Sequence, residues 1–391
     1  MTVLRSIFRF LLGLVAATIV AELVLQINAA TPLWQVLPVP TVMFYGPDPD
    51  SGFSHRPNVS GIWTAENRTH VRISSLGLRD RERAFKRSGA ARAIVIGDSI
   101  IEAVQVEQPD TATAVAERIL SAKRPSAEVI NLGLQGVTPA VQVARLQSIG
   151  LALQPDVAVL LVTLDWFLSD TIKDDSLTPG YKRNADGRYE LSYAFRNGRG
   201  YKFRTSQGGA FVYWLLDHSL VARVINARRN AGWFAEWPKP AEHPPELTSG
   251  PQDECQSARM ARQRALWVDG QPAEAAGILD AVIRDLSKIS RDNKLPVVLV
   301  MRNIGLGCEQ FTELRKALTD AIEKRLAAAG LGFVDFDGLL LEKNGSPVVD
   351  RLHGFGKGLG SGHLNIGGNR IYGEILAQII AAQPELRRWR D

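Results

Sequence analysis

The residues best suited to chemistry follow a short apolar run in the first third of the chain. Ala93–Ile96 is rich in β-branched side chains and stops at Gly97, Asp98 and Ser99. Such a run predicts a buried strand with an abrupt end, after which a helix can begin. Open α/β sheets bind ligands at the carboxyl ends of their strands, and free N–H groups at a helix start favour negative charge. We therefore expect the Ser99 hydroxyl to be able to attack a substrate.

A nucleophilic serine needs a base to accept its proton and N–H donors to hold an oxyanion. The chain has six histidines. The candidate base is His363, which lies in the glycine-rich segment 360–365 just before the last predicted helix. That segment could fold back to the sheet edge that carries Ser99. The alternative interpretation is that His363 is an ordinary surface residue of a loop.

The elements that must position these residues alternate between strands and helices. Apolar runs predict strands at 93–96, 128–132, 157–163, 295–301 and 332–336. Amphipathic segments predict helices at 111–122, 139–150, 272–290, 310–329 and 366–382. Because the strand runs are apolar on both faces, they predict a parallel sheet with helices on each side. The fold class is therefore α/β, a three-layer sandwich with a central parallel sheet.

Two regions depart from this alternation. Short alternating runs at 51–90 predict a small β element in front of the main sheet. Residues 170–255 are polar, aromatic and rich in Gly and Pro, which predicts an irregular insertion or lid with one helix at 211–228. Within it, Tyr181–Phe211 interleaves cations with aromatic residues. That pattern fits a solvated β-hairpin, and it also fits a surface that grips a sugar chain or an acidic polymer.

The N-terminus predicts a membrane segment. Residues 1–27 carry Arg5 and Arg9 before an apolar run of about the length that spans a bilayer. The interpretation is a retained anchor with a cytoplasmic N-terminus, and a cleaved signal peptide is the alternative. Residues 28–50 are expected to be a juxtamembrane linker, and 51–391 the folded body. The predicted location is the inner membrane, single-pass, with the body in the periplasm or outside the cell.

The composition narrows the function classes. The chain has 391 residues, 45% of them hydrophobic, and a net charge of +5, values typical of a globular protein with a full core. No nucleic-acid-binding motif, metal-ligand spacing or dinucleotide fingerprint occurs, so no nucleic acid, metal or cofactor is expected. In an oxidising compartment, Cys255 and Cys308 are equally compatible with a disulfide and with two free thiols.

Three blocks stand in order along the chain: Gly97-Asp98-Ser99, Asn131 with Gly136, and His363-Leu364-Asn365-Ile366-Gly367-Gly368. The segments that flank them are 52–58, 75–80 and 154–157. The ordered blocks resemble the SGNH/GDSL hydrolase superfamily, and the flanking segments resemble a bacterial membrane-anchored branch of it. The resemblance covers roughly residues 50–382 and implies the SGNH/flavodoxin-like form of the α/β sandwich.

The resemblance implies a role for each of five residues. Ser99 would be the nucleophile and His363 the general base. The backbone N–H groups of Ser99 and Gly136 would hold the oxyanion. Asp98 and Asn131 would brace the turns that carry these groups.

The chain departs from the family pattern at three positions. Ala103 stands where the family has a glycine. Trp166 stands where the family has an asparagine that donates to the oxyanion, and such a donor is worth a few kcal/mol. Gly360 stands where the family has the aspartate that orients the histidine. Asp350 or Asp165 is expected to replace that carboxylate in space, with Ser361 or a backbone carbonyl as alternatives. We expect Trp166 and Asn365 to contact substrate.

Two functions remain open from the sequence. The first is an exported esterase or acyltransferase acting on acetyl or other acyl groups of a carbohydrate through an acyl-serine. The second is a degenerate relative that binds glycan or scaffolds an envelope assembly with other envelope proteins. Retention of Ser99 and His363 favours the first function, and the missing oxyanion donor and orienting acid favour the second.

Overall fold

The computed structural model describes residues 2–35, 40–84, 91–164, 167, 177–231, 257–302, 312–344 and 350–383. Its centre is a parallel sheet of five strands in the order β11-β10-β7-β5-β6. When the five strands are numbered 1 to 5 by their place in the sequence and read from the β6 edge, this is the 2-1-3-4-5 order of flavodoxin-like folds. The strands are β5 (Ala91–Ile96), β6 (Ala127–Asn131), β7 (Val157–Thr163), β10 (Val297–Arg302) and β11 (Gly332–Asp335).

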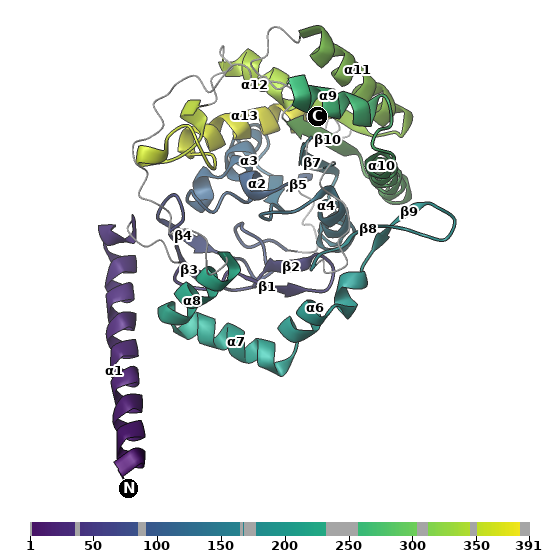
Figure 1. The fold of residues 1–391 in the computed structure, drawn as a ribbon. Helices are drawn as coiled ribbons and strands as arrows, with labels where there is room; N and C mark the ends of the chain where they lie inside the picture. Colours follow the sequence, from purple (N-terminus) through teal and green to yellow (C-terminus); the bar gives the residue numbers. More distant parts are fainter. Residues whose placement is uncertain are drawn as a thin grey trace.

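Helices cover both faces of the sheet, which confirms the predicted three-layer α/β class (Figure 1). Alternate side chains of each strand enter two separate cores: Val95 and Val159 face one, Ile94 and Leu160 the other. The first core is closed by α3 (Ala112–Lys123), α12 (Phe336–Asn344) and α13 (Ile366–Ala382). The second is closed by α4 (Pro139–Arg145), α9 (Ser257–Trp267), α10 (Ala273–Asn293) and α11 (Thr312–Ala328).

Two β-hairpins precede the sheet. They are β1 (Tyr45–Asp48) with β2 (Gly52–His55), and β3 (Ser60–Trp63) with β4 (Thr69–Arg72). The first strand corrects the predicted linker at 28–50, because residues 45–48 already belong to the body. Tyr45-Gly46-Pro47-Asp48 contains the residue types of a turn, which is why the sequence did not indicate a strand there.

The N-terminal helix α1 (Thr2–Ala30) is longer than the predicted segment 1–27. The helical segment 3–30 is long and apolar enough to cross a membrane, and most of its apolar side chains are exposed, with Ala29 as a buried exception (Figure 1). The Glu22 carboxylate in α1 accepts hydrogen bonds from the backbone N–H groups of Leu220 (2.8 Å) and Val221 (3.1 Å). The helix is therefore attached to the body by a polar contact.

The predicted insertion contains a hairpin and three helices in its described part, residues 177–231. The hairpin is β8 (Gly180–Arg183) with β9 (Tyr189–Ser192), followed by α6 (Arg199–Arg204), α7 (Gln207–His218) and α8 (Leu220–Ala231). The single helix expected at 211–228 is wrong, because Ser219 has an extended backbone and its hydroxyl accepts from the Ala222 N–H at the start of α8. Tyr181, Phe195 and Tyr201 are buried, so much of the cation–aromatic pattern reflects packing.

A buried polar cluster joins the first hairpin to the sheet edge. Glu102 is fully buried and accepts hydrogen bonds from the Tyr45 hydroxyl and from His55, each at 2.6 Å. Removing one partner of a buried polar pair leaves the other groups unsatisfied, which costs about 3–5 kcal/mol.

We therefore expect Glu102→Ala to lower the free energy of unfolding in urea by about 3–5 kcal/mol. Glu323→Ala, at an exposed position of α11, is the control and should change it by less than about 0.5 kcal/mol. Equal effects of the two substitutions would contradict this role of Glu102.

Candidate active site

Ser99 begins a short helical turn directly after β5. The turn, α2 (Ser99–Glu102), is capped by Asp98, whose carboxylate accepts a hydrogen bond from the Ile100 N–H at 2.9 Å. A Cβ at Gly97 would lie 2.5 Å from a side-chain carbon of Ile101, so only glycine fits this close approach. Among the described residues the Ser99 hydroxyl has no hydrogen-bond partner, and its side chain is partly exposed. The nucleophile candidate is thus held by its neighbours while its oxygen stays free.

The segment after β6 packs against this turn. The Asn131 amide donates to the Ile101 carbonyl (2.7 Å) and accepts from the Gly133 N–H (2.8 Å). A Cβ at Gly133 would lie 2.1 Å from the Glu102 backbone nitrogen, so the two backbones touch. Gly136 follows in an exposed turn with φ +65°. Asp98 and Asn131 therefore both form hydrogen bonds with the backbone of the turn.

His363 is paired with a carboxylate that the sequence did not indicate. Its Nδ1 lies 2.6 Å from Glu66 Oε1, and its backbone N–H donates to Glu66 Oε2 at 2.8 Å. The two side chains are 29% and 34% exposed. The hydrogen bond that His363 donates to the Glu66 carboxylate raises the pKa of His363 above its usual value, against the opposing effect of burial. Burial would raise the pKa of Glu66, but the contacts with His363 outweigh it and lower that pKa.

Hydrogen bonds connect the turn that contains Glu66 both to the loop of His363 and to the segment after the Ser99 turn. Glu66 lies between β3 and β4, and this hairpin is tied to the segment after α2 by Asn67, which donates to the Gln105 carbonyl (2.9 Å), and by Thr69, which donates to the Val104 carbonyl (2.6 Å). The His363 imidazole also interacts electrostatically with Asp98, the residue before Ser99. The base candidate is therefore connected through the β3–β4 hairpin to the segment that follows the Ser99 turn.

Ser99 and His363 are not hydrogen-bonded to each other. Within the described residues His363 Nε2 has no hydrogen-bond partner either, so both atoms are free to meet a substrate. Hydrogen bonds between catalytic groups often form only when the substrate is bound.

The other predicted site residues have different outcomes. Asp165 and Trp166 lie outside the described residues, as do Cys255 and Cys308. Asp350 begins a short 3-10 turn, and the structure does not describe its side chain. The carboxylate at Nδ1 of His363 belongs to Glu66, whereas we had expected Asp165 or Asp350 there.

Asn365 has a structural role that corrects its expected contact with substrate. Its side-chain oxygen accepts from the Gly368 N–H at 2.9 Å and caps α13. Its side-chain amide donates to the Arg351 carbonyl at 2.9 Å. Both ends of the side chain are thus engaged within the protein, so we no longer expect it to bind substrate.

The sequence did not indicate two further residues near the site, His353 and Arg302. His353 lies beside the loop, with its Nδ1 2.8 Å from the Gly362 carbonyl, and burial lowers its pKa. Arg302 ends β10 and is buried, with its guanidinium 5.5 Å from the centre of the Tyr372 ring. Burial would lower the pKa of Arg302, but Tyr372 and Asp98 outweigh it and raise it. Arg302 therefore adds a fixed positive charge at the sheet edge.

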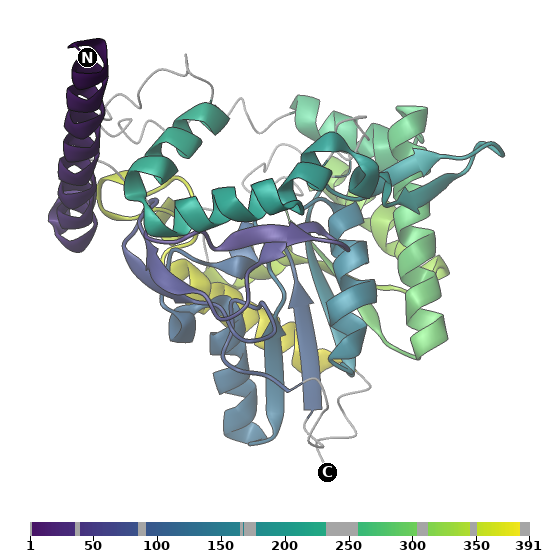
Figure 2. The same cartoon turned by 90° about the horizontal axis from the view of Figure 1, so that it is seen from below.

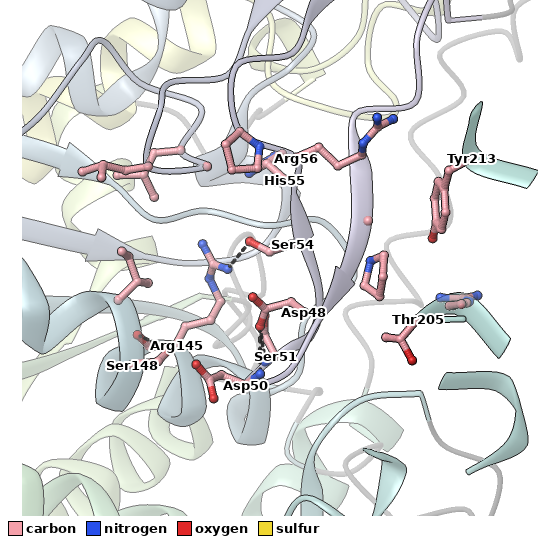
Figure 3. A pocket seen from close by; sticks show the side chains of 18 of the residues that line it. Asp48, Asp50, Ser51, Ser54, His55, Arg56, Arg145, Ser148, Thr205 and Tyr213 are labelled. Carbon is pink, nitrogen blue, oxygen red and sulfur yellow. Dashed lines mark hydrogen bonds between the residues drawn. The ribbon is translucent and has the colours of Figure 1, made fainter. Parts of the chain in front are cut away.

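A separate cavity of about 1050 Å³ lies between the β1–β2 hairpin, α4 and α7 (Figure 3). Neither Ser99 nor His363 lines it. Several of its charged groups are engaged within the protein: Arg56 forms two 2.7 Å hydrogen bonds with Asp217, and the buried Arg145 donates to Ser54 at 3.0 Å. Among the described residues, no group of three or more acidic, histidine or cysteine side chains could hold a metal ion.

Gly362 makes room for the carboxylate–histidine pair. Its φ is +81°, and a Cβ there would lie 2.6 Å from Glu66 Oε2. We expect Gly362→Ala to displace Glu66 and to lower the free energy of unfolding by about 1–3 kcal/mol, with a parallel loss of any esterase activity. Gly358→Ala, in the same loop, is the control because a Cβ there has no atom within 4 Å. Wild-type stability and activity of Gly362→Ala would contradict the role given to this pair.

No protein-family model matches the chain, and the comparison with curated proteins finds no relative. The chain is similar in fold to several solved structures. TesA is 12% identical (TM-score 0.37), with 74% of this chain and 98% of that chain covered. Axe2, an acetylxylan esterase from Geobacillus stearothermophilus, is 14% identical (TM-score 0.35; 76% and 98% covered). A putative lipolytic protein of the G-D-S-L family from Desulfitobacterium hafniense DCB-2 is 11% identical (TM-score 0.34; 74% and 99% covered).

The strand order of this chain is that of flavodoxin-like folds, as the resemblance to the SGNH/GDSL hydrolases implies. The motif blocks follow β5, follow β6 and precede α13, in the sequence order expected from the same resemblance.

Proposed function

We propose that the chain is a serine esterase or acyltransferase with Ser99, His363 and Glu66 as its triad. The observation that carries the proposal is the 2.6 Å contact between Glu66 and His363 Nδ1. A carboxylate at Nδ1 fixes the ring and its tautomer, so that Nε2 is the atom that accepts a proton. Glu66 supplies the carboxylate that orients His363, which Gly360 lacks. The presence of this carboxylate favours an active enzyme over a degenerate relative.

The proposed reaction has two acyl transfers. Ser99 Oγ attacks the ester carbonyl while His363 Nε2 takes its proton, and the oxyanion is held by the N–H groups of Ser99 and Gly136. The C–O bond to the alcohol then breaks, and His363 returns the proton to the departing oxygen. Water or a sugar hydroxyl next attacks the acyl-serine while His363 takes its proton. The bond between the acyl carbon and Ser99 Oγ then breaks, and His363 returns the proton to Ser99 Oγ.

The substrate proposed is an O-acyl group, acetyl above all, on a carbohydrate of the cell envelope. Support comes from the location that α1 implies, since an exported body anchored to the inner membrane meets polymers of the envelope. The contacts of Glu22 with the start of α8 favour retention of α1 as an anchor, because cleavage after the helix would remove them. In this proposal the protein partners are other proteins of the envelope, and nucleic acid is not a partner.

The alternative is a glycan-binding or scaffolding protein without turnover. The observation that favours it is Trp166 at the position of the expected amide donor. Loss of one oxyanion donor lowers kcat by about 10²- to 10³-fold, which slows an enzyme without removing its nucleophile.

The test is acetate release by the full-length protein in detergent. We expect turnover of p-nitrophenyl acetate and faster release from O-acetylated oligosaccharides, both lost in Ser99→Ala. Equal rates for the wild type and Ser99→Ala would contradict the proposal. Binding of the oligosaccharide without release would instead support the alternative.

A further inference from the structure

One side of α7 is apolar and exposed. Phe211, Trp214 and Leu215 are 62%, 54% and 39% exposed, and their spacing places them on the same face of the helix. The opposite face packs on the body, where Gly209 and Leu216 are buried. A surface helix normally turns its apolar stripe inward, so α7 carries a second apolar stripe that no described part of the protein covers.

Exposed aromatic residues concentrate in this part of the molecule. Outside α1, the exposed Phe and Trp side chains of the described residues are Phe203, Phe211 and Trp214, all in α6 and α7. Ile225 of α8 is also exposed, at 53%. Exposed cations flank the patch: Arg199, Lys202 and Arg229. Aromatic and aliphatic side chains bordered by arginine and lysine are typical of helices that lie in a membrane interface.

The contact between α1 and α8 fixes where this patch lies relative to the membrane segment. Glu22 binds the first N–H groups of α8 and the hydroxyl of Ser219, which joins α7 to α8. An apolar span that begins after Arg9 needs about 20 residues, which at 1.5 Å per residue rise about 30 Å, the thickness of the hydrocarbon core of a bilayer. Such a span ends near Ala29, about 10 Å beyond Glu22. A spanning α1 therefore brings the α7–α8 corner to within about 10 Å of the outer boundary of the hydrocarbon.

The orientation of the helices agrees with this depth. In Figure 1, α1 descends from the body towards the N-terminus, α7 runs crosswise to it along the lower side, and α11 lies at the opposite, upper side. Seen from below in Figure 2, the teal helices run across one part of the body and leave the rest of it in view. The helices thus lie on the side of the body towards which α1 extends, without covering all of it.

We propose that the exposed apolar face of α7 and α8 lies in the interface of the same membrane that α1 crosses. This inference rests on α1 as a retained anchor and is independent of the catalytic proposal. Phe211, Trp214 and Leu215 enter the boundary between head groups and acyl chains, and the flanking cations contact lipid phosphates. The body then sits with one fixed side on the membrane, and the Ser99 edge keeps a constant height above it.

The test uses the full-length chain in vesicles of phosphatidylethanolamine with a minor share of phosphatidylglycerol. A photoreactive benzophenone amino acid replaces Phe211 or Leu215, and in a matched control it replaces Glu323, an exposed residue of α11. After irradiation, the mass of the intact protein reports lipid adducts. Each variant is first checked for wild-type thermal unfolding.

We expect lipid adducts at positions 211 and 215 to exceed those at 323 by about ten-fold or more. Adduct levels equal to those at 323 would overturn the proposal. Cross-linked dimers in place of lipid adducts would also overturn it, because a second copy of the chain would then cover this face. The result does not depend on esterase activity, so its failure and that of the proposed function are distinguishable.

Discussion

Ser99→Ala is expected to lower kcat for p-nitrophenyl acetate by about 10⁴- to 10⁶-fold, the loss typical of a serine enzyme without its nucleophile. The Ser99 hydroxyl is the atom that forms the acyl intermediate, and alanine removes it with little change in volume. Because the Asp98 cap and the Asn131 contacts involve other atoms, the turn should keep its shape. The measurement is steady-state kinetics of the purified variant.

The control for this substitution is Ser121→Ala. Ser121 lies on the exposed side of α3, where its hydroxyl donates to the Arg118 carbonyl at 3.2 Å. We expect its kcat to stay at the wild-type level. A Ser99→Ala enzyme that keeps more than a small fraction of the wild-type rate would show that another group carries the reaction.

Glu66→Gln is the second substitution with a large expected effect, a loss of about 10²- to 10⁴-fold in kcat. The glutamine keeps the shape of the side chain but removes the charge that holds His363 and stabilises its protonated form. Asp165→Asn and Asp350→Asn are the comparisons, since the sequence had suggested those carboxylates for the same role. A large loss in either of them, with Glu66→Gln close to the wild type, would reverse the assignment.

The pH dependence of the activity of Glu66→Gln distinguishes loss of the interaction with His363 from general structural damage. Glu66 raises the pKa of His363, and a general base must be neutral, so wild-type activity should rise with pH through a value above 6.5. In Glu66→Gln the pKa of His363 falls, and the acid limb of kcat/KM should move to lower pH. An unchanged acid limb would contradict direct contact between Glu66 and the base.

The same pair makes a contribution to stability with a defined pH window. The raised pKa of His363 means that its contribution is fully present below 6.5 and is lost as the pH rises through the folded-state value. The lowered pKa of Glu66 means that its contribution is present above 4.5 and is lost as the pH falls through the folded-state value. The pair therefore stabilises the fold most between these two limits.

The sheet was predictable because its signal is local. Each of the five parallel strands is a continuous apolar run, and both faces of such a run must be buried. The expected run at 157–163 matches β7 in full, and 332–336 differs from β11 by one residue. The errors fall where local preference is weak: β1 contains a glycine and a proline, and Ser219 breaks a stretch that is compatible with a continuous helix.

The serine and histidine of the candidate site were predictable, and the carboxylate was not. Ser99 and His363 stand in motif blocks beside recognisable elements. Glu66 lies 297 residues before His363, in a polar turn where no periodicity distinguishes it from other turn residues. Gly360, where the family has its aspartate, adopts φ +93°, a conformation that strains other residue types. The orienting group therefore comes from another part of the chain.

The most direct test of the triad is labelling of the full-length protein with a fluorophosphonate, read by mass spectrometry. An activated serine reacts with this probe, and an ordinary hydroxyl does not. The account predicts one adduct, on Ser99, that is lost in His363→Ala and slowed in Glu66→Gln. No adduct on Ser99, or equal labelling in the wild type and His363→Ala, would contradict it.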